Sequence, residues 1–270
     1  MDDRIENVRR YYDSQPQQEY DRINGRAEFR FTVRYMDRYI RPGHRVLDIG
    51  GGPGRYSHYL AARGAEIMLL DLSPEHVRFA REKAEEMGLN IRAIAGDARF
   101  ADELADGEYD HVLLMGPLYH LLEEKDRVKC VEAAMKKLKS GGTLWAAFIN
   151  MTGDLIFRLR NDPSSILIAE GPDAAFREKL RQGVEYAGEA FTDAYFTWPK
   201  RAVEFMSRFP LDMLHIFPQE GLLAQCEDKI LAAGEAVTEA WLDMSEAMCE
   251  REEYWNWGEH LMIVGRKRIC

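Results

Sequence analysis

The chain has 270 residues, of which 46% are hydrophobic and 30% charged, a composition typical of a folded globular protein. Its formal net charge of -10 disfavours binding to nucleic acid or to anionic membranes. The four cysteines lack a disulfide or metal-binding pattern, and no signal peptide or ~20-residue apolar span is recognisable, which favours a cytoplasmic protein without membrane contact.

The segment 1–39 has helical spacing and many aromatic side chains. "VRRYYD" and "EYDRI" place Tyr11, Tyr12 and Tyr20 in this segment. Tyrosines at helical spacing are typical of packing residues, so a packing role is the alternative to any role of these three in binding.

Five strand-like segments follow, and most are continuously apolar. They are predicted at 45–50, 66–71, 91–97, 109–116 and 142–149. Continuous apolar runs are typical of strands that are buried on both faces of a parallel sheet.

Helical segments separate these strands. Ser73 is an N-cap signal and Gly88 a stop signal, which predicts a helix between them. Apolar residues in 128–138 also recur at helical spacing, and this second helix is predicted to end at the glycine pair 141–142. Alternating strands and helices predict a parallel sheet whose ligand site lies at the carboxyl ends of the strands.

The aromatic segment 151–205 follows the fifth predicted strand and is interpreted as an insertion. Apolar runs return at 211–217 and 260–268, where two further strands are predicted to complete the sheet. The domain organisation predicted from these patterns is an N-terminal helical segment, an insertion, and a core formed by 40–150 and 206–270.

The loop after the first strand carries the sequence "DIGGGPGR". Glycines between a strand and a helix allow a tight turn and a close approach of a ligand to the backbone. The dinucleotide pattern GxGxxG fails here, because Arg55 stands where a count from Gly50 needs a glycine, and Ser57 where a count from Gly52 needs one. A nicotinamide oxidoreductase is therefore disfavoured.

This stretch resembles the class I S-adenosylmethionine-dependent methyltransferases. "VLDIGGGPGRYS", "LLDLS", "AGDA", "YDHVLLMGPLYHL" and "LKSGGTL" are similar to five motifs of that family, in the family's order, over 40–150. The resemblance implies an α/β fold with a Rossmann-like, doubly wound, mostly parallel seven-stranded sheet and helices on both faces. It also implies S-adenosyl-L-methionine as cofactor and S-adenosyl-L-homocysteine as product.

The resemblance assigns cofactor contacts to two acids, and a third acid, Asp48, suits the ammonium group of the implied ligand. Asp71 would hold the ribose hydroxyls, Asp97 would approach the adenine amino group, and Asp48 would order the amino-acid end of the ligand. Each acid has an alternative: Asp48 fixes the turn, Asp71 caps the helix that follows, and Asp97 is a loop acid that binds no ligand. The other implied cofactor-binding residues are Gly50, Gly51, Gly52, Gly54, Leu72, Gly96, Ala98, Met115 and Gly116.

The two segments outside the core also acquire implied roles. In many small-molecule members of the family, helices before the first strand cover the cofactor, which implies that 1–39 is a lid with Tyr11, Tyr12 and Tyr20 facing substrate or cofactor. The segment 151–205 lies where substrate-specificity elements commonly occur, and a dimer surface, with a homodimer as the assembly, is its alternative.

Catalytic candidates lie in the loop after the fourth strand. Tyr119 and His120 are on this loop, and histidine can act as a base near neutral pH if the acceptor must lose a proton. Packing or capping of the next helix is the alternative for His120. No cluster of Asp, Glu and His indicates a metal-dependent catechol-type site, so no metal is expected.

The leading interpretation is a methyltransferase that acts on a small-molecule partner by in-line displacement. A macromolecular methyltransferase acting on RNA or protein is one alternative, although the acidic composition disfavours RNA. A non-catalytic S-adenosylmethionine-binding regulatory protein is the other, because fold does not decide function. The acceptor and the atom that is methylated are not determined by the sequence.

Overall fold

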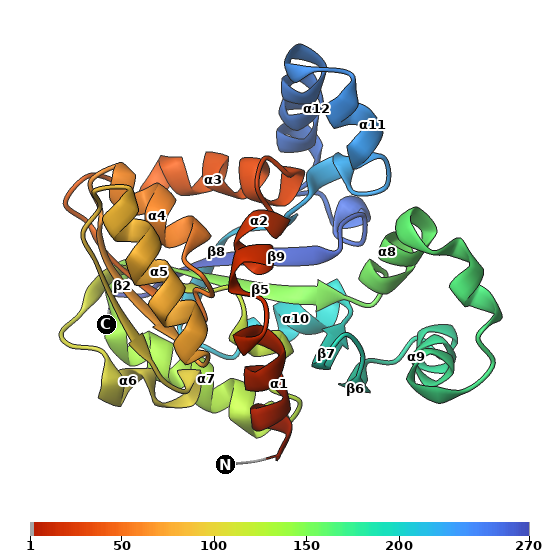
Figure 1. Cartoon of the computed structure of the whole chain (residues 1–270), viewed down its shortest axis with the longest axis horizontal. Helices are drawn as coiled ribbons and strands as arrows, with labels where there is room; N and C mark the ends of the chain where they lie inside the picture. Colours follow the sequence, from red (N-terminus) through yellow and green to blue (C-terminus); the bar gives the residue numbers. More distant parts are fainter. Residues whose placement is uncertain (1–2, 270) are drawn as a thin grey trace.

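Figure 1 shows a computed structural model of the chain, which describes residues 3–269, as a central sheet with helices on both faces. Nine strands form the sheet within this described part of the chain. The strands are β1 (Arg45–Ile49), β2 (Glu66–Asp71), β3 (Ile91–Ala95), β4 (Tyr109–Leu114), β5 (Leu138–Asn150), β6 (Tyr186–Glu189), β7 (Asp193–Thr197), β8 (Leu211–Pro218) and β9 (His260–Lys267).

The strand order confirms the predicted doubly wound architecture. Strands β3, β2, β1, β4 and β5 are parallel neighbours, while β9 pairs antiparallel with β5 and β8 pairs antiparallel with β9. All seven predicted strands are therefore present. The count of seven is corrected to nine, because the short β6–β7 hairpin of the segment 151–205 joins the sheet where β7 pairs with Ile149 and Asn150 of β5.

The helices separate the strands as the alternating pattern predicts, with additional helices before β1 and after β5 (Figure 1). No helix among the described residues is both long and apolar enough to cross a membrane. The helices are α1 (Asp3–Asp13), α2 (Pro16–Arg22), α3 (Ala27–Tyr39), α4 (Arg55–Ala62), α5 (Pro74–Glu86), α6 (Ala101–Leu104), α7 (Glu124–Lys137), α8 (Gly153–Asn161), α9 (Gly171–Arg181), α10 (Pro199–Met206), α11 (Glu227–Ala232) and α12 (Glu235–Met248).

Apolar side chains on both faces of the sheet explain the continuous hydrophobic runs. Leu47 and Ile49 of β1 belong to the core that α7 covers, whereas Val46 belongs to the core on the opposite face, beneath α3 and α4. Successive side chains of a strand point to opposite faces, so a strand covered on both faces needs apolar residues throughout.

The fifth strand begins earlier than predicted. Leu138 was expected in the preceding helix, but α7 ends at Lys137 and Leu138 pairs with Tyr109 of β4. The glycine pair lies inside the strand, at a register shift, because Gly141 has φ +79° and a Cβ on Gly142 would lie 2.6 Å from the Asp110 carbonyl oxygen. The glycines therefore mark an irregularity in β5 rather than the helix stop that was predicted.

The α11–α12 pair projects away from the sheet (Figure 1) and is tied to α3 by ion pairs. Arg34 of α3 pairs with Glu239 and, at 2.8 Å, with Asp243 of α12. Exposed ion pairs contribute little singly, but shared partners along two helices form a network that fixes their relative position.

Candidate functional site

A cavity of about 1090 Å³, counting its open mouth, lies at the carboxyl ends of the parallel strands. Helices α1 and α2 contribute the opposite wall, with Ile5, Val8, Tyr12, Glu19 and Arg22. Every sequence-predicted cofactor residue except Gly54 lines this cavity. Those residues are Asp48, Gly50, Gly51, Gly52, Asp71, Leu72, Gly96, Asp97, Ala98, Met115 and Gly116.

The glycine loop is shaped by the loop that follows β4. Gly50 has φ +71°, and a Cβ on it would lie 2.4 Å from Cδ of Pro117. Gly116 approaches from the same side, since a Cβ on it would lie 3.0 Å from the carbonyl oxygen of Gly50. Gly54 caps α4 in a left-handed conformation with φ +90°, behind the loop rather than on the cavity wall. Only glycine meets these conditions without strain.

Asp48 is a buried acid beneath the glycine loop. It is 3% exposed and accepts a 2.7 Å hydrogen bond from the Ser57 hydroxyl of α4. Burial raises the pKa of this carboxyl to about 7, against the opposing effect of the Ser57 hydrogen bond. A cationic group bound nearby would favour the ionised form, which suits the expected position of a ligand ammonium.

Asp71 at the end of β2 holds two loops together. Its carboxylate accepts hydrogen bonds from the backbone N–H of Gly52 at 2.7 Å and of Ser73 at 2.9 Å. His76 of α5 lies beside it, with Nδ1 3.5 Å from Asp71 Oδ1. A carboxylate has about four acceptor positions, so Asp71 keeps acceptor capacity on the cavity wall after these contacts.

Asp97 has a strong partner within its own loop. Arg99 contacts both carboxylate oxygens, at 2.6–3.1 Å, and donates its backbone N–H to Oδ1. The same guanidinium reaches Asp126 of α7 at 3.1 Å. Asp97 is therefore fixed on the cavity wall by contacts within its own loop, and its contact with a ligand stays a prediction.

Tyr12 and His120 form a hydrogen-bonded pair across the cavity. The Tyr12 hydroxyl lies 2.8 Å from Nε2 of His120, and Nδ1 of His120 lies 3.0 Å from the carbonyl oxygen of Asp193 in β7. A carbonyl only accepts, so Nδ1 carries a hydrogen. Burial lowers the pKa of His120 to about 4, so the ring is neutral near pH 7, Nε2 is an acceptor, and Tyr12 is the donor.

The other candidate tyrosines have different surroundings. Tyr119 lines the cavity and donates its hydroxyl to the carbonyl of Met115 at 2.9 Å. Tyr11 packs edge-on against Tyr12 outside the cavity lining, with ring centres 5.1 Å apart. Tyr20 also lies outside the lining, where Arg55 sits 4.0 Å above its ring. The structure therefore brings Tyr12, Tyr119 and His120 to one cavity, whereas Tyr11 and Tyr20 pack outside its lining.

Charged residues of the N-terminal helices line the cavity and were missed by the sequence analysis. Arg22 pairs with Glu19 at 2.8 Å and with Glu28 at 2.9 Å, and all three are on the cavity wall. Burial raises the pKa of Glu28, but the Arg22 guanidinium outweighs it and leaves that pKa lowered. Charged residues in a helical segment are typical of a face exposed to solvent, so the sequence does not indicate that these three line a cavity.

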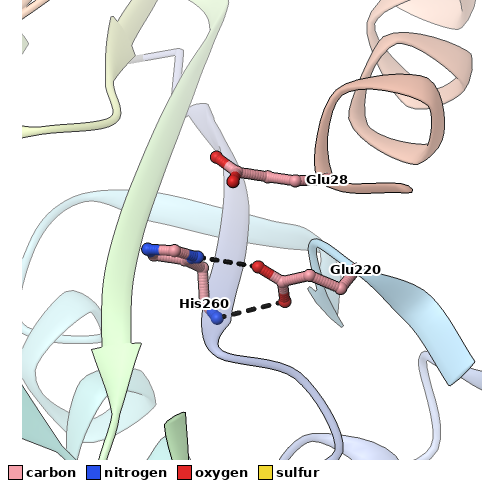
Figure 2. A group of neighbouring side chains, drawn as sticks. All are labelled: Glu28, Glu220 and His260. Carbon is pink, nitrogen blue, oxygen red and sulfur yellow. Dashed lines mark hydrogen bonds and ion pairs between the residues drawn. The ribbon is translucent and has the colours of Figure 1, made fainter. Parts of the chain in front are cut away.

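Figure 2 shows a second group that sequence reasoning missed, formed by Glu28, Glu220 and His260. Glu220 accepts from Nδ1 of His260 at 2.7 Å and from its backbone N–H at 3.1 Å. Burial lowers the pKa of His260, but Glu220 and Glu28 outweigh burial and raise it to about 9. The sequence carries no sign of this group, because the three residues are far apart along the chain and only the fold brings them together.

The comparisons with known proteins agree with this architecture. A family model described as a methyltransferase domain matches residues 46–142. The ubiquinone biosynthesis O-methyltransferase of Methylocella silvestris is 31% identical over 138 residues, which are 48% of this chain and 48% of that protein. The chain thus matches about half the length of such curated relatives.

Solved structures are similar over nearly the whole chain. An N-methyltransferase from Bradyrhizobium japonicum, in complex with S-adenosyl-L-homocysteine, has a TM-score of 0.57 at 13% identity, covering 97% of this chain and 98% of that chain. The magnesium protoporphyrin IX methyltransferase of Synechocystis PCC 6803, with bound S-adenosylmethionine, has a TM-score of 0.57 at 15% identity, covering 99% and 98%. Residues 46–142 therefore match a methyltransferase domain, and the chain has the fold of solved S-adenosylmethionine-dependent methyltransferases.

Proposed function

We propose that the protein is an S-adenosylmethionine-dependent methyltransferase that transfers the methyl group to a small-molecule acceptor by in-line displacement. The observation that carries this proposal is the single cavity shared by the glycine loop, Asp71, Asp97 and the Tyr12–His120 pair. The sheet side forms one wall of this cavity, and α1 and α2 form another.

In this proposal the sheet side of the cavity holds the cofactor. Asp71 accepts the ribose hydroxyls, the Asp97 loop flanks the adenine, and Asp48 faces the amino-acid end beneath the glycine loop. Methyl transfer from a sulfonium needs no metal or redox step. Orientation of the acceptor in line with the methyl group therefore supplies much of the rate, and a cavity wall formed by α1 and α2 excludes water from that alignment.

The Tyr12–His120 pair can take up a proton that the methyl acceptor loses. The Tyr12 hydroxyl donates to neutral His120, so its oxygen can accept a proton from an acceptor while its own proton moves to Nε2. Burial raises the pKa of Tyr12 well above its usual range, so a free phenolate is disfavoured and the two transfers are expected to be concerted. His120 acts through Tyr12 in this scheme.

The cofactor assignment is tested by thermal unfolding of the full chain with S-adenosylmethionine, S-adenosylhomocysteine, NAD and NADP in parallel. We expect the first two ligands alone to raise the melting temperature, by several degrees at about 100 times the dissociation constant, where binding adds ~2.7 kcal/mol. A shift with the nicotinamides instead would overturn the cofactor assignment.

Turnover is tested separately, by formation of S-adenosylhomocysteine in the presence of a library of small hydroxylated, amine and thiol acceptors. Acceptor-dependent conversion is expected. Cofactor binding without conversion by any small molecule, followed by conversion with RNA or protein, would support the macromolecular alternative. Binding without turnover on any acceptor would support a regulatory protein.

Tyr12→Phe is expected to lower kcat by about 10²- to 10⁴-fold for an acceptor that must lose a proton, since it removes the hydroxyl but keeps the ring. The dissociation constant for the cofactor should change little. Tyr11→Phe is the matched control, because Tyr11 is the adjacent tyrosine of α1 and lies outside the cavity lining. Equal losses in the two variants would contradict the relay.

The pH profile gives a second readout of the same pair. His120 has a lowered pKa of about 4, so its neutral, proton-accepting form persists as the pH falls below 6.5, where an ordinary histidine would become protonated. Wild-type kcat should therefore decrease only as the pH falls through about 4, and this decrease should be absent in Tyr12→Phe. A wild-type decrease centred near 6.5 would contradict a buried, neutral His120.

We also propose that the enzyme acts in the cytoplasm. Cys130, Cys226 and Cys249 are free thiols in the structure, and a reducing compartment keeps thiols in this state.

A further inference from the structure

The group of Glu28, Glu220 and His260 lies at the junction of three elements (Figure 2). Glu28 is the second residue of α3, Glu220 follows β8, and His260 is the first residue of β9. Glu28 also lines the main cavity, so the group lies where the N-terminal helices meet the sheet.

The three side chains converge closely enough to share one ion. One ligand atom from each residue lies within 4.8 Å of the other two. The closest pair is Nδ1 of His260 and Oε1 of Glu220, at 2.7 Å. Around zinc, with bonds of about 2.0–2.2 Å, tetrahedral ligand atoms lie about 3.4 Å apart, so small side-chain shifts would complete the geometry.

The group also retains unused polar atoms. One oxygen of Glu28 pairs with Arg22, and the other has no hydrogen-bond partner within residues 3–269. The hydroxyl of Tyr56, a residue of the same cavity wall as Glu28, is buried and has no partner in the described part of the chain. Buried polar atoms normally have partners, so this hydroxyl can accept a contact from a molecule or water bound in the cavity.

Two carboxylates face the imidazole of His260 and the guanidinium of Arg22 in this group. A metal ion that binds there displaces the proton from the imidazole, because metal ligands must be deprotonated. Glu259 adds a further carboxylate next to His260 in the chain, although Arg160 pairs with it at 2.9 Å.

We propose that Glu28, Glu220 and His260 form a binding site for one divalent cation of the zinc class. An imidazole with two carboxylates suits zinc better than magnesium, which prefers oxygen ligands and retains its waters. Three protein ligands leave at least one coordination position for water or for an oxygen atom of a cavity occupant. The site does not depend on the proposed methyl transfer.

Metal binding at this site would join α3 to β8 and β9. Because the three ligands come from segments far apart in the chain, the unfolded protein lacks the assembled site, and the cation is expected to stabilise the folded state. Zinc should therefore raise the melting temperature of the full chain as well as bind to it.

The test is isothermal titration of the chelator-treated full chain with zinc chloride and, separately, with magnesium chloride. One equivalent of zinc is expected to bind, and magnesium at the same concentration is not. Glu28→Gln and His260→Ala are each expected to weaken zinc binding by about 100-fold or more, since even loss of an outer partner of a metal ligand typically costs 10- to 100-fold.

His215→Ala is the matched control. His215 makes a comparable 3.0 Å pair with Glu250 but belongs to no three-residue ligand group among residues 3–269, so its loss should leave zinc affinity unchanged. Glu28→Gln preserves size and is the decisive variant if His260→Ala fails to fold, as judged by circular dichroism. Absence of zinc binding by the wild type, or binding that survives Glu28→Gln at wild-type affinity, would overturn the proposal.

Discussion

Replacing Gly50 by alanine adds one methyl group and is expected to lower the free energy of unfolding by about 2–5 kcal/mol. Two effects add together. The left-handed conformation at φ +71° is strained for any residue with a Cβ, and the new carbon would lie 2.4 Å from Cδ of Pro117. Pro117 is a ring between two backbone atoms, so it cannot rotate away as a flexible side chain would.

Gly88→Ala separates these two effects. Gly88 follows α5 with φ +65°, nearly the conformation of Gly50, but a Cβ there would meet nothing within 4 Å. Its substitution should therefore cost only the conformational strain, about 1–2 kcal/mol. Urea unfolding of both variants measures the difference. Equal losses would mean that the loop after β4 can move away from Gly50, and that the close contact does not hold the cavity wall.

The contact between the loops after β1 and β4 also explains why the glycine loop departs from the dinucleotide pattern. Gly50 and Gly116 are close to each other because the loops after β1 and β4 are in direct contact. Arg55 stands where the dinucleotide pattern has its third glycine, and it begins α4 with its guanidinium over the ring of Tyr20. The glycines of this loop therefore allow the two loops to come into contact. Arg55 instead packs on Tyr20 and so holds α2 against α4.

The central sheet and the sheet side of the cavity could be predicted from the sequence, because both follow from local patterns. Continuous apolar runs mark the buried strands, and the acids Asp48, Asp71 and Asp97 lie within two residues of the ends of those strands. In a parallel sheet, strand ends meet at one edge, so local sequence places these acids together without any knowledge of distant contacts.

The opposite side of the cavity could not be predicted in the same way. Tyr12 reaches His120, and Glu28 reaches His260, only because the N-terminal helices pack across the ends of the strands. The family resemblance implied the same role for Tyr11, Tyr12 and Tyr20, although only Tyr12 lines the cavity. Periodicity fixes which residues share a helix face, whereas the rotation of that face relative to the sheet depends on tertiary packing.

The short β6–β7 hairpin could not be predicted from the sequence for a related reason. The β6–β7 hairpin joins the sheet through only two residue pairs with β5, too few to give a hydrophobic period. That hairpin nevertheless matters to the site, because the carbonyl of Asp193 at the start of β7 fixes the tautomer of His120. The segment 151–205 thus contributes an orienting contact to the cavity, whereas its role in acceptor specificity stays a prediction.

Asp71→Ala is expected to weaken binding of S-adenosylmethionine by about 10- to 150-fold, corresponding to the loss of charge-assisted hydrogen bonds of roughly 1.5–3 kcal/mol. The Asp71 carboxylate has two roles. It is proposed to accept the ribose hydroxyls, and it accepts the backbone N–H of Gly52 at 2.7 Å and of Ser73 at 2.9 Å. Removing it therefore withdraws a ligand contact and leaves two loop donors without their partner.

Asp71→Asn distinguishes these tasks, because the amide retains one acceptor oxygen for a loop N–H but loses the charge. Calorimetric affinities should decrease in the order wild type, Asp71→Asn, Asp71→Ala. Glu75→Ala is the control for general electrostatics, since Glu75 is a half-buried acid in the first turn of the adjacent α5 and lies outside the cavity lining. If Asp71→Ala folds and binds the cofactor as tightly as Glu75→Ala, Asp71 orders the loops alone, and the ribose contact must be assigned to another residue of the cavity.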